Sequence, residues 1–400
     1  MLFFIPSSAS FNYVPAMKQA DSIYLDHAAA TFLLPVVQDH IAEWVQNKTV
    51  NPSSIHGKGR LAAAQLDQAR QDVASVLGAK PSEIIFTSGG TEANNLALVG
   101  IAESLEKQGK HIITCTTEHP SVLESCKQLE SRGFRVTYLT TDSKGNIDLD
   151  ELRNSIEDDT ILISIMWVNN ETGLIHPVHT IAGIAKEHGI KFHCDAAQAL
   201  GHIPIRADSL GADAITFSAH KIGAPSGLGV LYIRKGTSLE RQIQGGGQES
   251  NHRAGTQNLL GASAFAKAIQ FHYDHFQEHE AHFNSVMIHL QNQLLTMSGV
   301  QINRGKDGYS PHILNCSFHN IDGEALFIRL DMKNISVSNG AACSSGSQAP
   351  SHVLSALGIE DSLAQASLRL SLGLDTSIAE IDQFCDELED ILHSIKNEKR

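Results

Sequence analysis

The sequence predicts an α/β fold, in which a mainly parallel β-sheet is covered by helices and joined to a smaller α+β domain. Three observations point to it. The chain has 400 residues, too many for one hydrophobic core, so two domains are expected. From about residue 57, short apolar runs alternate with amphipathic helical segments, as in buried parallel strands with crossover helices. Near residue 261 this alternation stops and a long helical stretch begins.

The first region shows strands and helices in turn. Gly57 begins an amphipathic helix, and Gly78 is placed to end it after Leu77. Apolar strands are expected at 83–87, 111–116, 160–167, 190–194, 214–217 and 230–234, with helices from 91, over 120–130 and over 180–188. Ligands of such sheets bind at the carboxyl ends of the strands, so the polar residues that follow each strand are the candidates for a site.

The second region has a different pattern. We expect a long helical stretch over 261–297, strands at 312–318 and 368–372, a helix at 323–331, a polar loop at 339–349 and a last helix. That last helix begins with a capping box formed by Ser377 and Glu380. We assign residues 25–270 to the large domain, and residues 1–24 and 271–400 to the small domain.

Composition limits the class of function. The formal net charge is -14, which argues against a nucleic-acid surface because phosphates require clustered Lys and Arg. No apolar run is long enough to cross a bilayer, and residues 1–10 lack the basic region of a signal peptide, so we expect a loose N-terminal extension. The six cysteines include no CxxC pair, which favours a reduced, cytoplasmic protein.

Polar segments follow five of the expected strands. They are 88–91 (SGGT), 118–119 (EH), 169–171 (NNE), 195–198 (DAAQ) and 218–221 (SAHK). Each has an ordinary explanation by itself: a Gly-Gly-Thr turn is usually only a turn, a strand-terminal Asp usually caps a helix, and a lone Lys is usually a surface residue. Five of them at strand ends favour a single ligand site.

Together these segments supply what pyridoxal phosphate (PLP) needs. Lys221 offers an amine for a Schiff base, and Asp195 offers a carboxylate that keeps the pyridine nitrogen protonated. Gly89 and Gly90 let backbone N–H groups approach a phosphate, and the helix that starts at Thr91 adds a favourable field.

The chain resembles the fold-type I, class V aminotransferase superfamily and, within it, the NifS/IscS-type cysteine desulfurases. The resemblance runs from Tyr24 to about Leu392. The matching segments are 24–26, 51–56, 87–95, 117–119, 168–173, 195–198, 218–221, 245–249, 253–256, 338–347 and 368–373. It implies a fold-type I PLP-dependent transferase.

The resemblance also implies roles at the cofactor. Lys221 would hold PLP as a Schiff base and move the substrate's Cα proton, while His119 would stack on the ring and serve in proton transfer. Asp195 would pair with the pyridinium nitrogen. The other implied contacts are Gln198 and Asn170 to the ring hydroxyl and nearby substrate atoms, and Gly90, Thr91, Ser218 and His220 to the phosphate.

Two further roles concern the substrate and the assembly. Arg369 would bind the substrate carboxylate, which suits a bidentate guanidinium. Thr256 would reach the phosphate of the neighbouring subunit's cofactor, which implies a homodimer with shared sites.

Cys343 distinguishes desulfuration from other PLP chemistry. It lies in a small, polar, Gly-punctuated segment typical of an exposed loop, where a thiolate is reactive. By resemblance, its thiolate would attack the sulfur of bound L-cysteine, forming an enzyme persulfide and releasing alanine. Asn339 and Ala341 stand where the family more often has Ser.

Alternatives remain at this stage. The same residues suit a selenocysteine lyase or another class V transaminase, and a catalytically idle PLP-fold scaffold is the non-enzymatic alternative. The last residues lack the extended tail by which housekeeping members dock an iron–sulfur scaffold, so the acceptor protein could belong to cluster assembly, tRNA thiolation, DNA phosphorothioation or another route. We expect no metal: His272, His275, His279 and His282 are interpreted as a solvated helix face.

Overall fold

The computed structural model describes residues 22–46, 50–305, 307–339 and 350–398. The large sheet contains β2 (Ile84–Thr87), β3 (His111–Cys115), β4 (Arg135–Leu139), β5 (Thr160–Ser164), β6 (Lys191–Asp195), β7 (Ala214–Ser218) and β8 (Gly229–Ile233). Its helices are α1 (Pro35–Gln46), α2 (Gly57–Leu77), α3 (Gly90–Leu105), α4 (Pro120–Ser131), α5 (Leu149–Asn154), α6 (Val178–Glu187), α7 (Ala207–Leu210) and α8 (Leu259–Asp274). Single 3-10 turns are η1 (Pro81–Glu83), η2 (Ala219–Lys221) and η3 (Glu249–Asn251).

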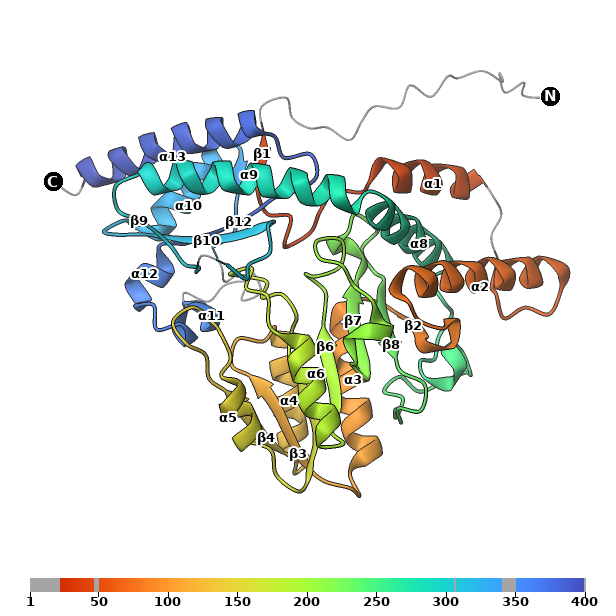
Figure 1. Cartoon of the computed structure of the whole chain (residues 1–400). Helices are drawn as coiled ribbons and strands as arrows, with labels where there is room; N and C mark the ends of the chain where they lie inside the picture. Colours follow the sequence, from red (N-terminus) through yellow and green to blue (C-terminus); the bar gives the residue numbers. More distant parts are fainter. Residues whose placement is uncertain (1–21, 47–49, 306, 340–349, 399–400) are drawn as a thin grey trace, which may run out of the picture.

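The remaining elements form a smaller body beside this sheet (Figure 1). They are β1 (Ile23–Tyr24), α9 (Phe276–Thr296), β9 (Val300–Ile302), β10 (Ile313–Phe318), α10 (Gly323–Met332), β11 (Ile335–Ser336), α11 (His352–Ala356), α12 (Asp361–Gln365), β12 (Ser367–Ser371) and α13 (Ile378–Glu398). The expected capping box is confirmed, because Ser377 N–H donates to Glu380 at 2.8 Å and Glu380 N–H donates to Ser377 Oγ at 3.2 Å.

The strand order of the large sheet is β2-β8-β7-β6-β5-β3-β4. The strands from β7 to β4 pair in parallel, which confirms the expected mainly parallel sheet. The exception is β8, which runs antiparallel to both β7 and β2. Since an apolar run carries no direction, the sequence could not show this reversal.

Helices cover both faces of the large sheet. On one face, α2, α6 and α8 share a core with the strands, and on the other face α3 and α4 do so. A third core lies in the smaller body, where α9, α10 and α13 pack against β10 and β12, with α9 and α13 side by side (Figure 1). No helix among the described residues is both long and apolar enough to span a membrane.

The long helical stretch expected over 261–297 is divided in the structure. The structure has two helices, α8 and α9, separated at His275, whose φ and ψ of -109° and 17° are not helical. The physical reason is that α8 packs into the core of the large sheet and α9 packs into the small core, so the chain changes direction between them. We propose that these cores mark the two domains, with the boundary at the break between α8 and α9.

His176 is a buried histidine just before α6. Neither of its ring nitrogens has a hydrogen-bond partner in the described part of the chain, and burial lowers its pKa to about 4. Between pH 4 and about 6.5 the unfolded chain binds a proton at this ring and the folded chain does not, so the folded state loses stability as the pH falls through this window.

We therefore expect His176→Met to lower the slope of unfolding free energy against pH, near pH 5, by about 1 kcal/mol per pH unit. Urea unfolding at several pH values measures this slope. His179→Met is the matched control, because His179 is exposed in the folded protein and should leave the slope unchanged. An equal slope in wild type and His176→Met would contradict the prediction.

Candidate active site

A cavity of about 690 Å³ lies at the carboxyl ends of β2, β6 and β7. Its wall is completed by residues 28–30 and by Arg369 of β12, from the smaller body. The expected site residues that line it are Gly90, Thr91, His119, Asn170, Asp195, Gln198, Ser218, His220, Lys221 and Arg369. The volume is within the usual range for small-molecule sites.

Lys221 lies in the 3-10 turn directly after β7. Its Nζ donates to the carbonyl oxygens of Ala28 and Ala29, at 2.6 and 2.7 Å. Gln198 Nε2 also donates to the Ala28 carbonyl, at 2.8 Å. The segment around Ala28 is itself held by the Ser371 hydroxyl, which accepts from Ala28 N–H at 2.8 Å. The amine is therefore positioned at the cavity wall by backbone that arrives from the start of the chain.

Asp195 is the last residue of β6 and is buried. Its Oδ1 accepts from Ala197 N–H at 2.9 Å, and its Oδ2 accepts from Asn94 Nδ2 at 2.7 Å. These bonds fix the carboxylate in one orientation with lone pairs remaining, which is what a partner for a protonated ring nitrogen requires.

His119 caps the N-terminus of α4. Its Nδ1 accepts from Ser121 N–H at 3.1 Å and lies 2.8 Å from Ser121 Oγ. Burial lowers the pKa of the ring, and Lys221 lowers it further although Asp195 acts in the opposite direction. The ring is therefore neutral at physiological pH.

The start of α3 lies at one end of the cavity. Backbone N–H groups at Gly90 and Thr91 belong to the first turn, where helix donors and the helix dipole favour a phosphate. Ser218 Oγ and His220 Nδ1 lie 3.2 Å apart on the opposite side, and burial lowers the pKa of His220 to about 4, so the ring stays neutral and can donate one hydrogen bond.

This end of the cavity depends on a glycine in the facing strand. A Cβ at Gly229, the first residue of β8, would lie 2.4 Å from the Gly89 carbonyl carbon. Gly229 also pairs with both Thr87 and Ser218, so it joins the ends of β2 and β7. Any larger residue would push the turn before α3 outwards.

Arg369 occupies the side of the cavity nearest the smaller body. Its Nη2 donates to Asp26 Oδ1 at 2.7 Å and its Nη1 to the Asn170 carbonyl at 3.0 Å. Its Nε is buried and has no partner within the described ranges. A donor left in this state on a fixed guanidinium suits a substrate carboxylate.

A second carboxyl group lies close to Arg369. Burial raises the pKa of Glu171 to about 7, and the Ser351 hydroxyl donates to its carboxyl group. Ser351 also caps α11 through Val353 N–H. Glu171 thereby fixes the chain just after residues 340–349, and Cys343 itself lies outside the described residues.

The donor set fits pyridoxal phosphate. An amine, a fixed carboxylate and a neutral aromatic ring meet in one cavity whose far end offers helix N–H groups and hydroxyls. Thr256 does not line this cavity and is exposed, so its expected role at a neighbouring subunit's phosphate stays a prediction.

Sequence reasoning missed three polar residues of the site: Asn94, Ser121 and Asp26. Asn94 could have been found, because it stands on the apolar face of α3 between Ala93 and Leu96, where a buried amide needs hydrogen-bond partners. Asp26 gave no such signal, since its partner Arg369 is far away in the sequence. Nothing in the sequence distinguishes Ser121, which bonds both the neighbouring His119 and the distant Asn94.

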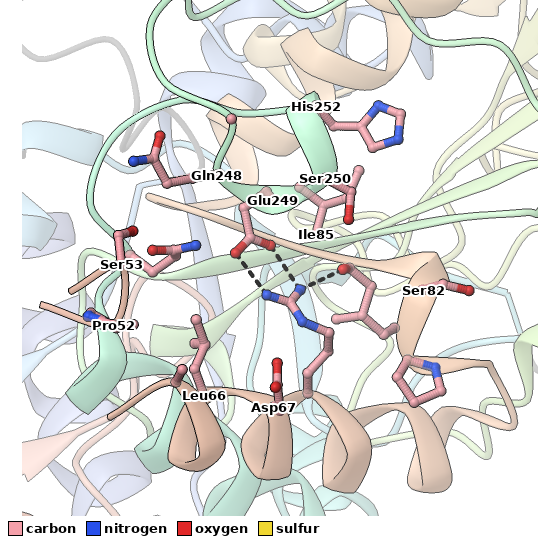
Figure 2. Close-up of a pocket in the computed structure, with 16 residues that line it drawn as sticks. Pro52, Ser53, Leu66, Asp67, Ser82, Ile85, Gln248, Glu249, Ser250 and His252 are labelled. Carbon is pink, nitrogen blue, oxygen red and sulfur yellow. Dashed lines mark hydrogen bonds and ion pairs between the residues drawn. The ribbon is translucent and has the colours of Figure 1, made fainter. Parts of the chain in front are cut away.

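A second cavity, of about 590 Å³, lies between α2, η1 and η3 (Figure 2). Glu249 is at its centre, with a fully buried side chain that forms two 2.7 Å hydrogen bonds with Arg70 and accepts from Phe86 N–H at 2.9 Å. Because this pair is internally satisfied, we interpret it as a structural link between α2, β2 and the segment after Gly245.

The histidines between 272 and 282 differ from the expectation of one solvated helix face. His272 and His279 are buried, with exposures of 5% and 9%, because α8 and α9 turn this side towards the junction of the two bodies. Within the described ranges, no group of three or more His, Cys, Asp or Glu is placed to hold a metal ion. The five described cysteines are buried free thiols.

Comparison with known proteins gives a consistent result. The model of the family "Aminotransferase class-V" matches residues 23–384. A cysteine desulfurase IscS of Dictyoglomus turgidum is 43% identical over 375 residues, which are 94% of this chain and 95% of that protein. One from Methanosarcina thermophila is 40% identical over 376 residues, 94% of this chain and 93% of that protein. A solved NifS-like protein aligns with a TM-score of 0.88 and 37% identity, covering 93% of this chain and 100% of that one.

The ion pair between Asp26 and Arg369 leads to a stability prediction. The two side chains are only 20% and 4% exposed, so removing one partner leaves the other charge without compensation. We expect Asp26→Ala to destabilise the protein by about 3 kcal/mol. The double variant Asp26→Ala/Arg369→Met should be less destabilised than Asp26→Ala alone, and urea unfolding measures both. Simple additivity of the two single substitutions would contradict the prediction.

Proposed function

The chain belongs to the class V aminotransferase family and is a cysteine desulfurase of the NifS/IscS type, and on this basis we propose that the cavity around Lys221 binds pyridoxal phosphate and L-cysteine. When bound, PLP supplies an electron sink that allows the Cα–H bond of an amino acid to break.

Lys221 would hold the cofactor covalently through its amine, with Asp195 at the ring nitrogen and His119 against the ring face. Gly90, Thr91, Ser218 and His220 would hold the phosphate at the start of α3, and Gln198 would reach the ring hydroxyl. The common cavity and the orientation of the Asp195 carboxylate support these assignments.

Arg369 and Asn170 would bind the substrate. The guanidinium is positioned by Asp26 and by the Asn170 backbone. Its Nε has no hydrogen-bond partner in the described part of the chain, so this donor would be left for the substrate carboxylate. A carboxylate held there would place the Cα proton towards Lys221, which takes that proton.

Cys343 would perform the sulfur step. Its thiolate attacks the sulfur of bound cysteine, so that an S–S bond forms and the C–S bond breaks. The electron pair of the C–S bond stays with the carbon, which takes up a proton and leaves as alanine. The persulfide on Cys343 then passes its outer sulfur to an acceptor protein.

The observation that carries this function is the meeting of Lys221, Asp195, His119 and Arg369 in one cavity. A transaminase would need the first three as well, but the described relatives are cysteine desulfurases at 40–43% identity over most of the chain. We therefore favour L-cysteine over selenocysteine and over plain transamination. The buried free thiols favour a cytoplasmic location.

We also propose a homodimer in which Thr256 completes the phosphate site of the neighbouring subunit. Thr256 is exposed and does not line the cavity of its own chain. The nearby Arg253 is fixed by Glu92 of α3, through hydrogen bonds of 2.8 and 3.2 Å. Burial alone would raise the pKa of Glu92, but the hydrogen bonds from Arg253 and Ser88 outweigh it and lower that pKa. Glu92 and Arg253 therefore form a charged pair that ties the segment around Thr256 to α3.

The function is tested with the purified protein. Wild type should show the visible absorbance of bound PLP and convert L-cysteine to alanine with sulfide in the presence of a thiol reductant. Cys343→Ala should keep the absorbance but form no persulfide, whereas Lys221→Ala should lose the covalently held cofactor. Cys385→Ala is the matched control, since that buried thiol should not carry sulfur. Full persulfide formation by Cys343→Ala would refute the assignment.

The shared site is tested by Thr256→Val. Loss of one hydrogen bond to the phosphate should weaken PLP binding about tenfold, which equilibrium dialysis measures. Sedimentation should show a dimer for wild type and variant alike. A monomeric protein, or a dimer whose PLP affinity is unaffected by Thr256→Val, would contradict the prediction.

A further inference from the structure

Two buried residues without an assigned role connect Asp195 to His119. Asn94, on α3, places Nδ2 at 2.7 Å from Asp195 Oδ2 and at 2.8 Å from Ser121 Oγ. Ser121, on α4, places Oγ at 2.8 Å from His119 Nδ1. Asn94 and Ser121 are 2% and 8% exposed, so water does not compete strongly for these bonds.

The direction of the chain is set at its carboxylate end. The Asp195 carboxylate only accepts, so the Asn94 amide must turn its NH₂ group towards it. The opposite orientation would place the amide oxygen against an anionic oxygen. This orientation leaves Asn94 Oδ1 buried without a hydrogen-bond partner among the described residues, which is unfavourable.

The next hydrogen bonds of the chain run from Asn94 through Ser121 to the His119 imidazole. The second N–H of Asn94 Nδ2 donates to Ser121 Oγ, where it occupies one lone pair of the hydroxyl and favours turning the hydroxyl proton towards His119 Nδ1. The same Nδ1 accepts from Ser121 N–H at 3.1 Å. Two donors aimed at one ring nitrogen exclude a proton from it, and the single proton of the neutral ring is on Nε2.

We propose that Asn94 and Ser121 are positioning residues that hold His119 as a neutral imidazole protonated at Nε2, through a one-way chain of hydrogen bonds from Asp195. The proposal rests on the roles of Asp195 and His119 in the proposed function and specifies one of them. His119 meets the cofactor and substrate as a hydrogen-bond donor at Nε2. It cannot accept a proton there unless the Ser121 bonds first break, so removal of the Cα proton falls to Lys221.

The tautomer can be observed without turnover. In cofactor-free protein labelled with ¹⁵N-histidine, the signals of His119 are identified by their absence in His119→Gln. At neutral pH, Nδ1 should have the shift of an unprotonated nitrogen and Nε2 that of a protonated one. Ser121→Ala should raise the protonation constant of the ring about tenfold, because one hydrogen bond that favours the neutral ring is lost.

Matched variants separate positioning from folding. Ser121→Thr keeps the hydroxyl and should restore the wild-type shifts. Ser125→Ala removes a buried hydroxyl one turn along α4, bonded to the Ser121 carbonyl and not to the ring, and should leave His119 unchanged. Asn94→Ala should raise the protonation constant as well, because the Ser121 hydroxyl then loses the donor that orients its proton towards Nδ1.

A proton on Nδ1 in wild type, or a titration of His119 that is equal in wild type and Ser121→Ala, would overturn the proposal. In the PLP-loaded enzyme, Ser121→Ala should lower kcat about tenfold with recovery in Ser121→Thr, as expected for one hydrogen bond. Unchanged kcat in Ser121→Ala would also overturn the positioning role. If the shifts are as expected but wild type releases no alanine, the proposed function fails while the hydrogen-bond chain stands.

Discussion

The site depends on the antiparallel strand β8, which lies between β7 and β2 and brings their carboxyl ends to the same edge. Gly229 begins this strand and pairs with the last residue of each neighbour. Because it has no Cβ, the Gly89 turn can fold against it. Lys221, which follows β7, and the first turn of α3, which follows β2, thereby line one cavity. A bulkier residue at position 229 would move the start of α3 away from the amine.

Charge in the cavity is controlled by pairing and burial together. Arg369 is paired with Asp26, and Asp195 is fixed by donors from Asn94 and Ala197, so these charges have partners before any ligand enters. Other groups are kept neutral: burial lowers the pKa of His119 and raises that of Glu118 well above its ordinary value. The charges of Arg369 and Asp195 are thus held in fixed positions for a ligand. Because His119 and Glu118 are neutral, they do not add competing charges beside them.

The described part of the small body mainly positions groups of the cavity. Arg369 of β12 is its contribution to the cavity, and Ser371 on the same strand holds the Ala28 backbone that accepts from Lys221. A movement of β12 would thus shift both the Arg369 guanidinium and the backbone that positions the Lys221 amine. The break between α8 and α9 matters for the same reason, since it sets how the two cores face each other across the cavity.

Much of this could be predicted from the sequence, for a physical reason. Strand and helix periodicity, the glycine that ends α2, the capping box of α13 and the polar residues after each strand are local features, and local features can be read from neighbouring letters. Asp195, His119 and Lys221 could be named because each lies at the end of a strand or within a few residues of it. Only the tertiary structure decided the reversed direction of β8, the break at His275, and the contacts of Asp26 with Arg369 and of Asn94 with Ser121. These depend on which segments meet in space, and no short-range pattern specifies that.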